Sequence, residues 1–308
     1  VFSNESFWTP FDSEEKTIVQ RVALSIISSE KQTIDEFISI RDKILAMISF
    51  AIKNNINVDE EYFLDYEDSY LIGDEIKDYF KHYLLSAQRE LEIYDVKLWD
   101  YNFTLNQLPP DKDINKDLEK LVPIFNLYLS LFKYRDMPIE MVFLNIVQAL
   151  ETFHSRFFYG NKKKKYVESV MERFSGSESF EKFKRKLLSD TQMDENCNYI
   201  ILVSRLNDLL IGNYNTLFYE YWEGEDDYGQ IIADTRHYYT HYGKEKEKKA
   251  LKGDRLRDAI FVLSRLLEYH ICLVLGIDIR EKVRQELNSH NSWKQLEASQ
   301  INEIDENV

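Results

Sequence analysis

The chain is poor in residues that break helices or cross-link chains. Its 308 residues include nine glycines, five prolines and two cysteines. The last proline is Pro138. The lack of proline in residues 139–308 favours a long, all-helical C-terminal half. The cysteines, Cys197 and Cys272, lie far apart without the spacing of metal ligands, which indicates a reduced, intracellular protein.

The chain also lacks long apolar runs and an excess of positive charge. No segment reaches the roughly 18 consecutive apolar residues of a membrane span, and the start has no signal-peptide pattern. We therefore expect a cytoplasmic protein that does not bind a membrane. The net charge of −15 argues against a protein that coats nucleic acid nonspecifically, but it leaves room for a local basic patch. Because the chain begins with Val1, we expect it to be a fragment.

Apolar and aromatic side chains are plentiful, at 44 % and 14 %, which is enough for a substantial core. Apolar residues recur at helical spacing and predict helices in four segments: 14–55, 113–135, 137–158 and 254–276. One or two further helices are predicted in 178–221, whereas alternating apolar residues predict a strand in 90–105. The fold class is therefore mainly α, with helices and a few strands in residues 1–135 and a helical domain in residues 136–308.

The densest group of chemically active side chains is ADTRHYYTHYG, residues 233–243. Arg236 and His241 are five positions apart, so one ideal helix would hold them about 140° apart, on well-separated flanks. A joint site then needs an irregular turn or a second surface. Symmetric pairing of two subunits would supply that surface.

These residue types suit cleavage of RNA without a metal. A guanidinium such as that of Arg236 is always charged and grips phosphate oxygens, and an imidazole such as that of His241 takes or gives a proton near neutral pH. RNA carries its own nucleophile, the 2′-OH, beside every phosphate. The tyrosines Tyr238, Tyr239 and Tyr242 would stack on bases or donate hydrogen bonds.

Two other interpretations of this segment stay open. Asp234, His237 and His241 fall on one helical face, a layout compatible with a carboxylate and two imidazoles on Zn²⁺ or Fe²⁺. Such a site would make the protein a metal-dependent hydrolase. Alternatively, Tyr238 and Tyr242 are core aromatics, and the histidines merely pack or cap.

Charged residues flank the segment in sequence. KEKEKKALKGDRLR, residues 244–257, has seven Lys or Arg against three Asp or Glu, and it would grip a substrate strand through Lys244 and Lys246. A solvated, mixed-charge helix start is the alternative. On the helix predicted over 137–158, Glu151 and His154 either face the site or, as we expect, belong to an ordinary polar helix face.

The segment MVFLNIVQALETFHSRFF, followed about 80 residues later by TRHYYTHY, resembles the HEPN domain of ApeA-like proteins. RLLEYHICLVLGID resembles the closing helix of that domain. HEPN domains are helical bundles, and many are metal-independent ribonucleases with an arginine, four to six residues and then a histidine. Arg236 and His241 match that motif. The family often has Asn directly after the arginine, where this chain has His237.

The resemblance implies an endoribonuclease of antiphage defence that acts by abortive infection and needs no cofactor. Arg236 would clamp the phosphate, His241 would act as general acid or base, and His237 would share the proton work or replace the Asn. HEPN nucleases typically form homodimers in which two motifs meet in one composite cleft.

The resemblance also suggests partners. Residues 1–135 would be the remnant of a sensor domain that responds to a phage-derived trigger, and transfer RNA is the expected substrate. The alternative within the family is a noncatalytic HEPN module that binds RNA or serves as a dimerisation scaffold.

Overall fold

The computed structural model describes eleven stretches of the chain: residues 2–7, 19–24, 26, 33–58, 85–87, 101–134, 136–158, 163–173, 200–211, 216–218 and 228–291. Contacts between Cα atoms divide the chain into two compact units, Val1–Tyr101 and Asn102–Val308. Among the described residues, no helix is long and apolar enough to cross a membrane.

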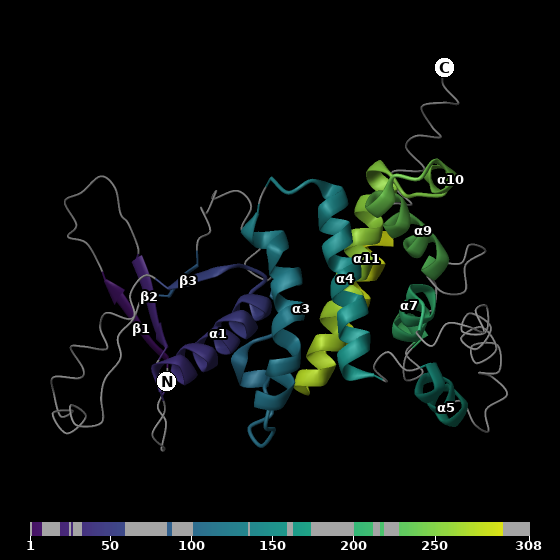
Figure 1. Ribbon diagram of the computed structural model, residues 1–308. Coiled ribbons are helices and arrows are strands. Elements are labelled where there is room, and N and C mark those ends of the chain that lie inside the picture. Colours follow the sequence, from purple (N-terminus) through teal and green to yellow (C-terminus); the bar gives the residue numbers. More distant parts are fainter. Residues whose placement is uncertain are drawn as a thin grey trace, which may run out of the picture. The chain divides into compact units, whose positions relative to one another are not determined.

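In its described residues, the first unit contains one long helix and two pairs of antiparallel strands (Figure 1). The strands are β1 (Phe2–Phe7) paired with β2 (Val19–Leu24), and β3 (Ile56–Val58) paired with β4 (Leu85–Ala87). The helix α1 (Ile34–Ala51) begins at Thr33, whose side chain forms a capping box with Glu36.

One prediction for the N-terminal part is wrong, and a second can be compared with the structure only at its end. Residues 19–24, expected to be helical, form β2, because pairing with β1 overrides a local pattern of apolar residues four positions apart. The strand predicted over 90–105 lies mostly outside the described residues. Its last part, from residue 101, is irregular and leads into the short 3-10 helix η3 (Leu105–Gln107).

The second unit is helical in its described residues. Its elements are α3 (Asn115–Lys133), α4 (Ile139–Phe157), α5 (Lys163–Arg173), α7 (Leu202–Ile211), the short η6 (Thr216–Phe218), α9 (Tyr228–His241), α10 (Lys244–Glu247), α11 (Gly253–Leu275) and a last helix at 280–291. The helices predicted over 113–135, 137–158 and 254–276 are confirmed. Gly276 ends α11 with φ of 82°, a left-handed conformation that favours glycine.

The helix α4 is central to this bundle, since it contacts α3, α7, α9 and α11 (Figure 1). Its predicted apolar face is buried: Phe143, Val147, Leu150 and Phe153 are at most 1 % exposed. The helix α3, which the sequence placed in the N-terminal part, packs against α4 within the second unit. The candidate site is therefore built on helices that share one core.

A buried polar network joins α3 to α11 and to the last helix. The hydroxyl of Tyr128 donates to a carboxylate oxygen of Glu268, and Arg265 binds Glu268 at 2.8 Å and Glu286 at 2.5 Å. Burial raises the pKa of Tyr128 well above its usual range, and the charge of Glu268 adds to this effect. The phenol therefore stays neutral and acts as a hydrogen-bond donor.

Candidate active site

The helix α9 is fixed to the bundle by the backbone of one residue, Leu251, which follows α10. The hydroxyl of Tyr239 donates to the carbonyl oxygen of Leu251 at 2.9 Å, and the N–H of Leu251 donates to the hydroxyl of Thr235 at 3.0 Å. Tyr239 also packs edge-on against Phe143 of α4. These contacts set the rotation of α9, and hence the direction in which its remaining side chains point.

Arg236 lies on the flank of α9 that faces α4. Its guanidinium is 4.0 Å from the carboxylate of Glu151, and the two side chains are 37 % and 31 % exposed. This distance is at the outer limit of an ion pair, so the contact holds the guanidinium only loosely. Arg236 is therefore a cation that is positioned by the fold and still open to an anion from solvent.

His237 and His241 lie together on an exposed flank of the same helix. Their ring centroids are 4.8 Å apart, as expected for residues one turn apart. Both residues are exposed, so each ring is open to solvent and to a bound molecule. The fold thus brings His237 beside His241, and within one chain it supplies an arginine on one flank and two imidazoles on another.

The three tyrosines of the segment have different surroundings. Tyr239 is 9 % exposed, and its hydroxyl donates to the carbonyl oxygen of Leu251. This buried position does not fit the substrate-binding role that was expected for Tyr239. Tyr242 is 65 % exposed, and its ring centroid is 5.5 Å from that of Tyr238. The ammonium of Lys252 lies 5.3 Å from the centre of the Tyr238 ring. Tyr242 is thus a surface aromatic, whereas Tyr238 is half-buried, so the alternative that both fill the core fails for Tyr242.

Asp234 is committed to the fold. It is 5 % exposed, and one carboxylate oxygen accepts from Gln230 at 3.0 Å and from Lys246 at 2.6 Å. Across the described residues, which include this whole segment, no group of three or more His, Cys, Asp or Glu is arranged to hold a metal ion. The trio of Asp234, His237 and His241 therefore does not come together as a ligand set.

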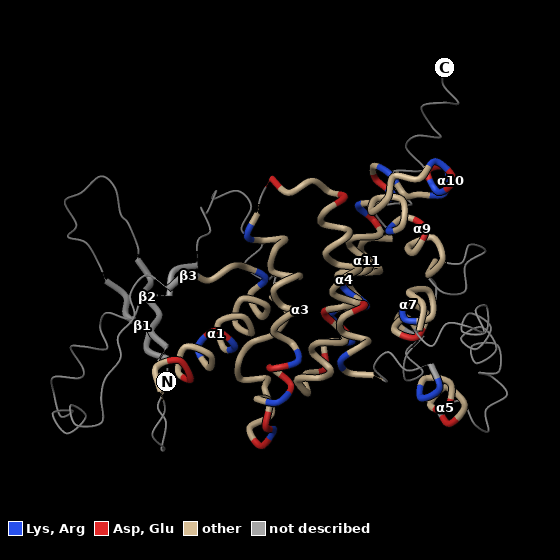
Figure 2. Tube along the Cα trace, in the orientation of Figure 1, with Lys and Arg blue, Asp and Glu red and all other residues tan. Residues whose placement is uncertain are grey.

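Lysines and arginines follow the histidines along the chain, in α10 and at the start of α11 (Figure 2). Lys246 forms an ion pair with Asp234 at 2.6 Å. Lys244 remains exposed, and so do several other cations of the segment: Lys248, Lys249, Lys252 and Arg255. Lys252 also pairs with Glu247 at 3.2 Å. The chain is acidic overall, yet this end of the bundle carries a local positive charge that suits a polyanion.

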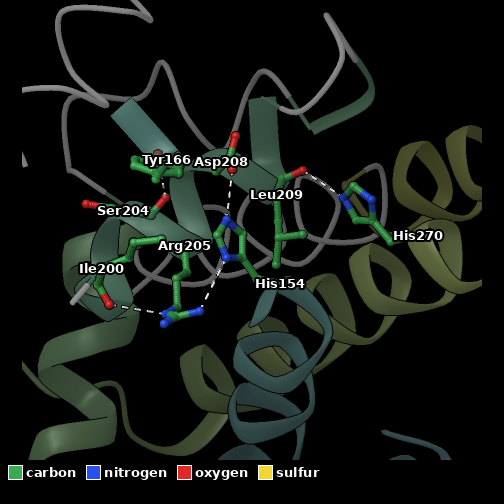
Figure 3. Close-up of polar contacts among 8 residues, drawn as sticks. All are labelled: His154, Tyr166, Ile200, Ser204, Arg205, Asp208, Leu209 and His270. Atoms are coloured by element: carbon green, nitrogen blue, oxygen red, sulfur yellow. Dashed lines mark hydrogen bonds and ion pairs between the residues drawn. The ribbon is translucent and has the colours of Figure 1, made fainter. Parts of the chain in front are cut away.

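A buried polar cluster between α4 and α7 was not found from the sequence (Figure 3). His154, expected on a polar helix face, is fully buried, and its Nε2 donates to Asp208 at 2.8 Å. Arg205 donates to the Nδ1 of His154 at 3.4 Å and to the carbonyl oxygen of Ile200 at 3.2 Å. Because an arginine is only a donor, the hydrogen of this imidazole is on Nε2.

Only one signal in the sequence pointed to that cluster. Arg205 and Asp208 are charged residues three positions apart in LVSRLNDLLI, within a helix that is otherwise largely buried. Charged residues in such a helix are seldom buried without partners. Their partner, His154, is about 50 residues away, so the pairing itself was not readable.

Residues 144–281 match the family model described as Apea-like HEPN. Over these residues, a little under half of the chain, the protein is similar to the Apea-like HEPN family. Comparison with curated proteins found no match, and comparison with solved structures found none either. The match covers most of α4 and all of α7, α9, α10 and α11, so the arginine, the histidines and the buried cluster all lie within the matched residues. HEPN domains are generally ribonucleases.

Proposed function

We propose that this HEPN protein is a metal-independent endoribonuclease. The observation that carries the proposal is the placement of Arg236, His237 and His241 on one helix of the HEPN domain, with all three open to solvent. Arg236 would bind the oxygens of the scissile phosphate and stabilise the charge that develops there. His241 would transfer the protons, with His237 sharing that work.

The reaction would use the 2′-OH of RNA as its nucleophile. One imidazole removes the 2′-OH proton while that oxygen attacks the neighbouring phosphorus. The bond from phosphorus to the 5′ oxygen of the next nucleotide breaks, and an imidazolium gives that leaving oxygen a proton. The products are a 2′,3′-cyclic phosphate and a 5′-OH. One base and one acid are needed, which is a chemical reason for two histidines.

A homodimer would complete the site. Arg236 and His241 are on separated flanks of α9, so a second copy facing the first supplies an arginine to the histidines and histidines to the arginine. Tyr238 and Tyr242 would stack on unpaired bases, while Lys244 and its exposed neighbours attract the RNA backbone. We propose transfer RNA as the substrate, since its loops present unpaired bases.

The biological role we propose is antiphage defence by abortive infection in the cytoplasm. Cleavage of cellular RNA would stop growth of the infected cell. The N-terminal unit would act as a sensor that responds to a phage-derived trigger. These assignments rest on the HEPN resemblance rather than on geometry.

The proposal is tested by incubating the purified chain with total RNA in EDTA, beside Arg236→Ala and His241→Ala. Arg156→Ala is the matched control, because Arg156 is an exposed arginine on α4 outside the site. We expect cleavage by the wild type and the control, and loss of about 100-fold or more in each site variant. Cleavage abolished by EDTA would favour a metal-dependent hydrolase, and a wild type that binds RNA without cutting it would favour a noncatalytic scaffold.

A further inference from the structure

Lys252 is brought beside the motif helix α9 by the residue that precedes it. Both backbone groups of Leu251 are bound to α9: its N–H donates to the hydroxyl of Thr235 at 3.0 Å, and its carbonyl oxygen accepts from Tyr239 at 2.9 Å. The ammonium of Lys252 lies 5.3 Å from the centre of the Tyr238 ring, within the range of a cation–π interaction. The fold therefore places this lysine against α9, although its side chain is 52 % exposed.

The ring of Tyr238 also contacts Tyr242. Their ring centroids are 5.5 Å apart in an edge-to-face arrangement, and Tyr239 packs against the same ring at 5.1 Å. Tyr238 is half-buried among these neighbours, whereas Tyr242 is 65 % exposed. An exposed aromatic ring and an exposed cation therefore contact one half-buried ring, and both lie within 5.5 Å of its centre.

We propose that Tyr242 and Lys252 form a subsite for one unpaired nucleotide of the RNA. The base stacks on the exposed Tyr242 ring, and a phosphate next to that base binds the Lys252 ammonium. Tyr238 is a positioning residue, because its ring contacts both groups, and stacking is thereby assigned to Tyr242 alone. A base inside a duplex has both faces covered, so the subsite selects unpaired RNA. This subsite rests on the proposed ribonuclease function.

Glu247 of α10 competes for the subsite. One of its carboxylate oxygens accepts from the Lys252 ammonium at 3.2 Å, and the Glu247 side chain is 49 % exposed. Such an exposed ion pair is weak, so an RNA phosphate can displace the carboxylate. The negative charge of Glu247 nevertheless opposes a phosphate at that position. Removing this charge is therefore expected to strengthen RNA binding.

The test measures the affinity of the full chain for three RNA probes that carry 2′-O-methyl groups, so that no 2′-OH can attack. The probes are a single strand, the same strand annealed to its complement, and a strand of the same length without bases. Attraction to charge alone favours the duplex, which has the denser charge, whereas stacking requires an unpaired base. We expect the wild type to bind the single strand with bases most tightly.

The two members of the subsite have different signatures. We expect Tyr242→Ala to weaken binding of the strand with bases about tenfold and to leave binding of the abasic strand unchanged. Lys252→Gln should weaken binding of both strands and reduce the slope of log affinity against log salt concentration by about 0.7, the size of one phosphate contact. Lys116→Gln is the matched control, because Lys116 is an exposed lysine on α3, and it should leave the slope unchanged.

The positioning residue and the competing carboxylate are tested in the same titrations. Tyr238→Leu should reduce the salt slope as Lys252→Gln does, and Tyr238→Phe, which keeps the ring, should restore it. A merely structural role of Tyr238 would lower the amount of active protein without changing the slope. Glu247→Gln should tighten binding of both single strands several-fold. Glu245→Gln, which removes an exposed glutamate from the same short helix, should have a smaller effect.

The subsite is overturned if Tyr242→Ala binds the strand with bases like the wild type, or if Lys252→Gln keeps the slope of Lys116→Gln. A wild type that prefers the duplex, or that binds none of the probes, overturns it too. Cleavage of unmodified RNA by the wild type decides the ribonuclease function separately. If the binding pattern holds while unmodified RNA stays intact, the subsite stands and the proposed ribonuclease fails.

Discussion

Tyr239, in the motif segment of α9, donates its hydroxyl hydrogen to the carbonyl oxygen of Leu251 at 2.9 Å. This bond ties the helix that carries Arg236 and His241 to the chain that returns after α10. Tyr239 therefore serves the fold, while Tyr238 is half-buried and Tyr242 is exposed.

Replacing Tyr239 by Phe removes this hydroxyl and leaves the Leu251 carbonyl without that donor. We expect a loss of about 1–3 kcal/mol in the free energy of unfolding, with RNA affinity unchanged. Urea unfolding and RNA-binding titrations measure the two quantities. Tyr242→Phe is the matched control, since that residue is exposed and its stability should not change. A Tyr239→Phe variant that keeps its stability but loses RNA binding would show that Tyr239 binds the substrate.

Gly229, in the first turn of α9, lies against Asn207 of α7, so the two helices approach closely there. A Cβ at position 229 would overlap the side-chain oxygen of Asn207, which is 1 % exposed and has little room to move. We expect Gly229→Ala to lower the free energy of unfolding by about 1–3 kcal/mol. Gly243→Ala is the control, because a Cβ there meets no atom within 4 Å. Equal stability of the two variants in urea unfolding would contradict this packing.

Tyr242 combines an exposed ring with a left-handed backbone, at φ of 51°. Tyr242→Gly should relieve about 1 kcal/mol of backbone strain and weaken RNA binding, since stacking of one base contributes about 1–3 kcal/mol. The melting temperature would therefore rise while the RNA affinity falls, as measured by thermal unfolding and RNA titration. Tyr242→Ala is the control: it keeps the Cβ and the strain, and it should lose RNA affinity without gaining stability. RNA affinity that is unchanged in both variants would remove Tyr242 from the binding surface.

Features of the fold and the site that depend on residues close in sequence could be predicted from the sequence, whereas those that depend on residues far apart in sequence could not. The helices α3, α4 and α11 follow from local periodicity, and Pro138 and Gly276 mark their limits correctly. The strand β2 was missed because pairing with β1, rather than local pattern, determines it. Within the site, the separation of Arg236 from His241 was predicted from helix geometry. The burial of Tyr239 was not predicted, because it depends on packing against Phe143 of another helix and on a hydrogen bond to the backbone of Leu251.

His270 of α11 should make stability depend on pH. It is fully buried, and its Nε2 donates to the carbonyl oxygen of Leu209 at 2.9 Å. Burial lowers its pKa from 6.5 to about 4, against the raising effects of Leu209 and Asp208. Between those two pH values the unfolded chain binds more protons than the folded one. Stability is therefore lost as pH falls from 6.5 toward 4, by roughly 3 kcal/mol in total.

His270→Gln keeps a donor for the Leu209 carbonyl and removes the titration. We expect its free energy of unfolding to fall less steeply between pH 6.5 and pH 4.5 than that of the wild type, measured by urea unfolding at several pH values. The many carboxylates titrate in both proteins, so the difference between the two slopes reports His270. Parallel slopes would show that His270 is not the group responsible.

The most direct test of the account is the chemistry of the RNA ends that the wild-type protein produces in EDTA. Mass spectrometry of the products distinguishes a 2′,3′-cyclic phosphate from a 3′-OH. We predict cyclic phosphate ends paired with 5′-OH ends, present with the wild type and Arg156→Ala, and absent with Arg236→Ala and His241→Ala. Ends that carry a 3′-OH, or cleavage that persists in both site variants, would contradict attack by the 2′-OH at a site built from Arg236 and His241.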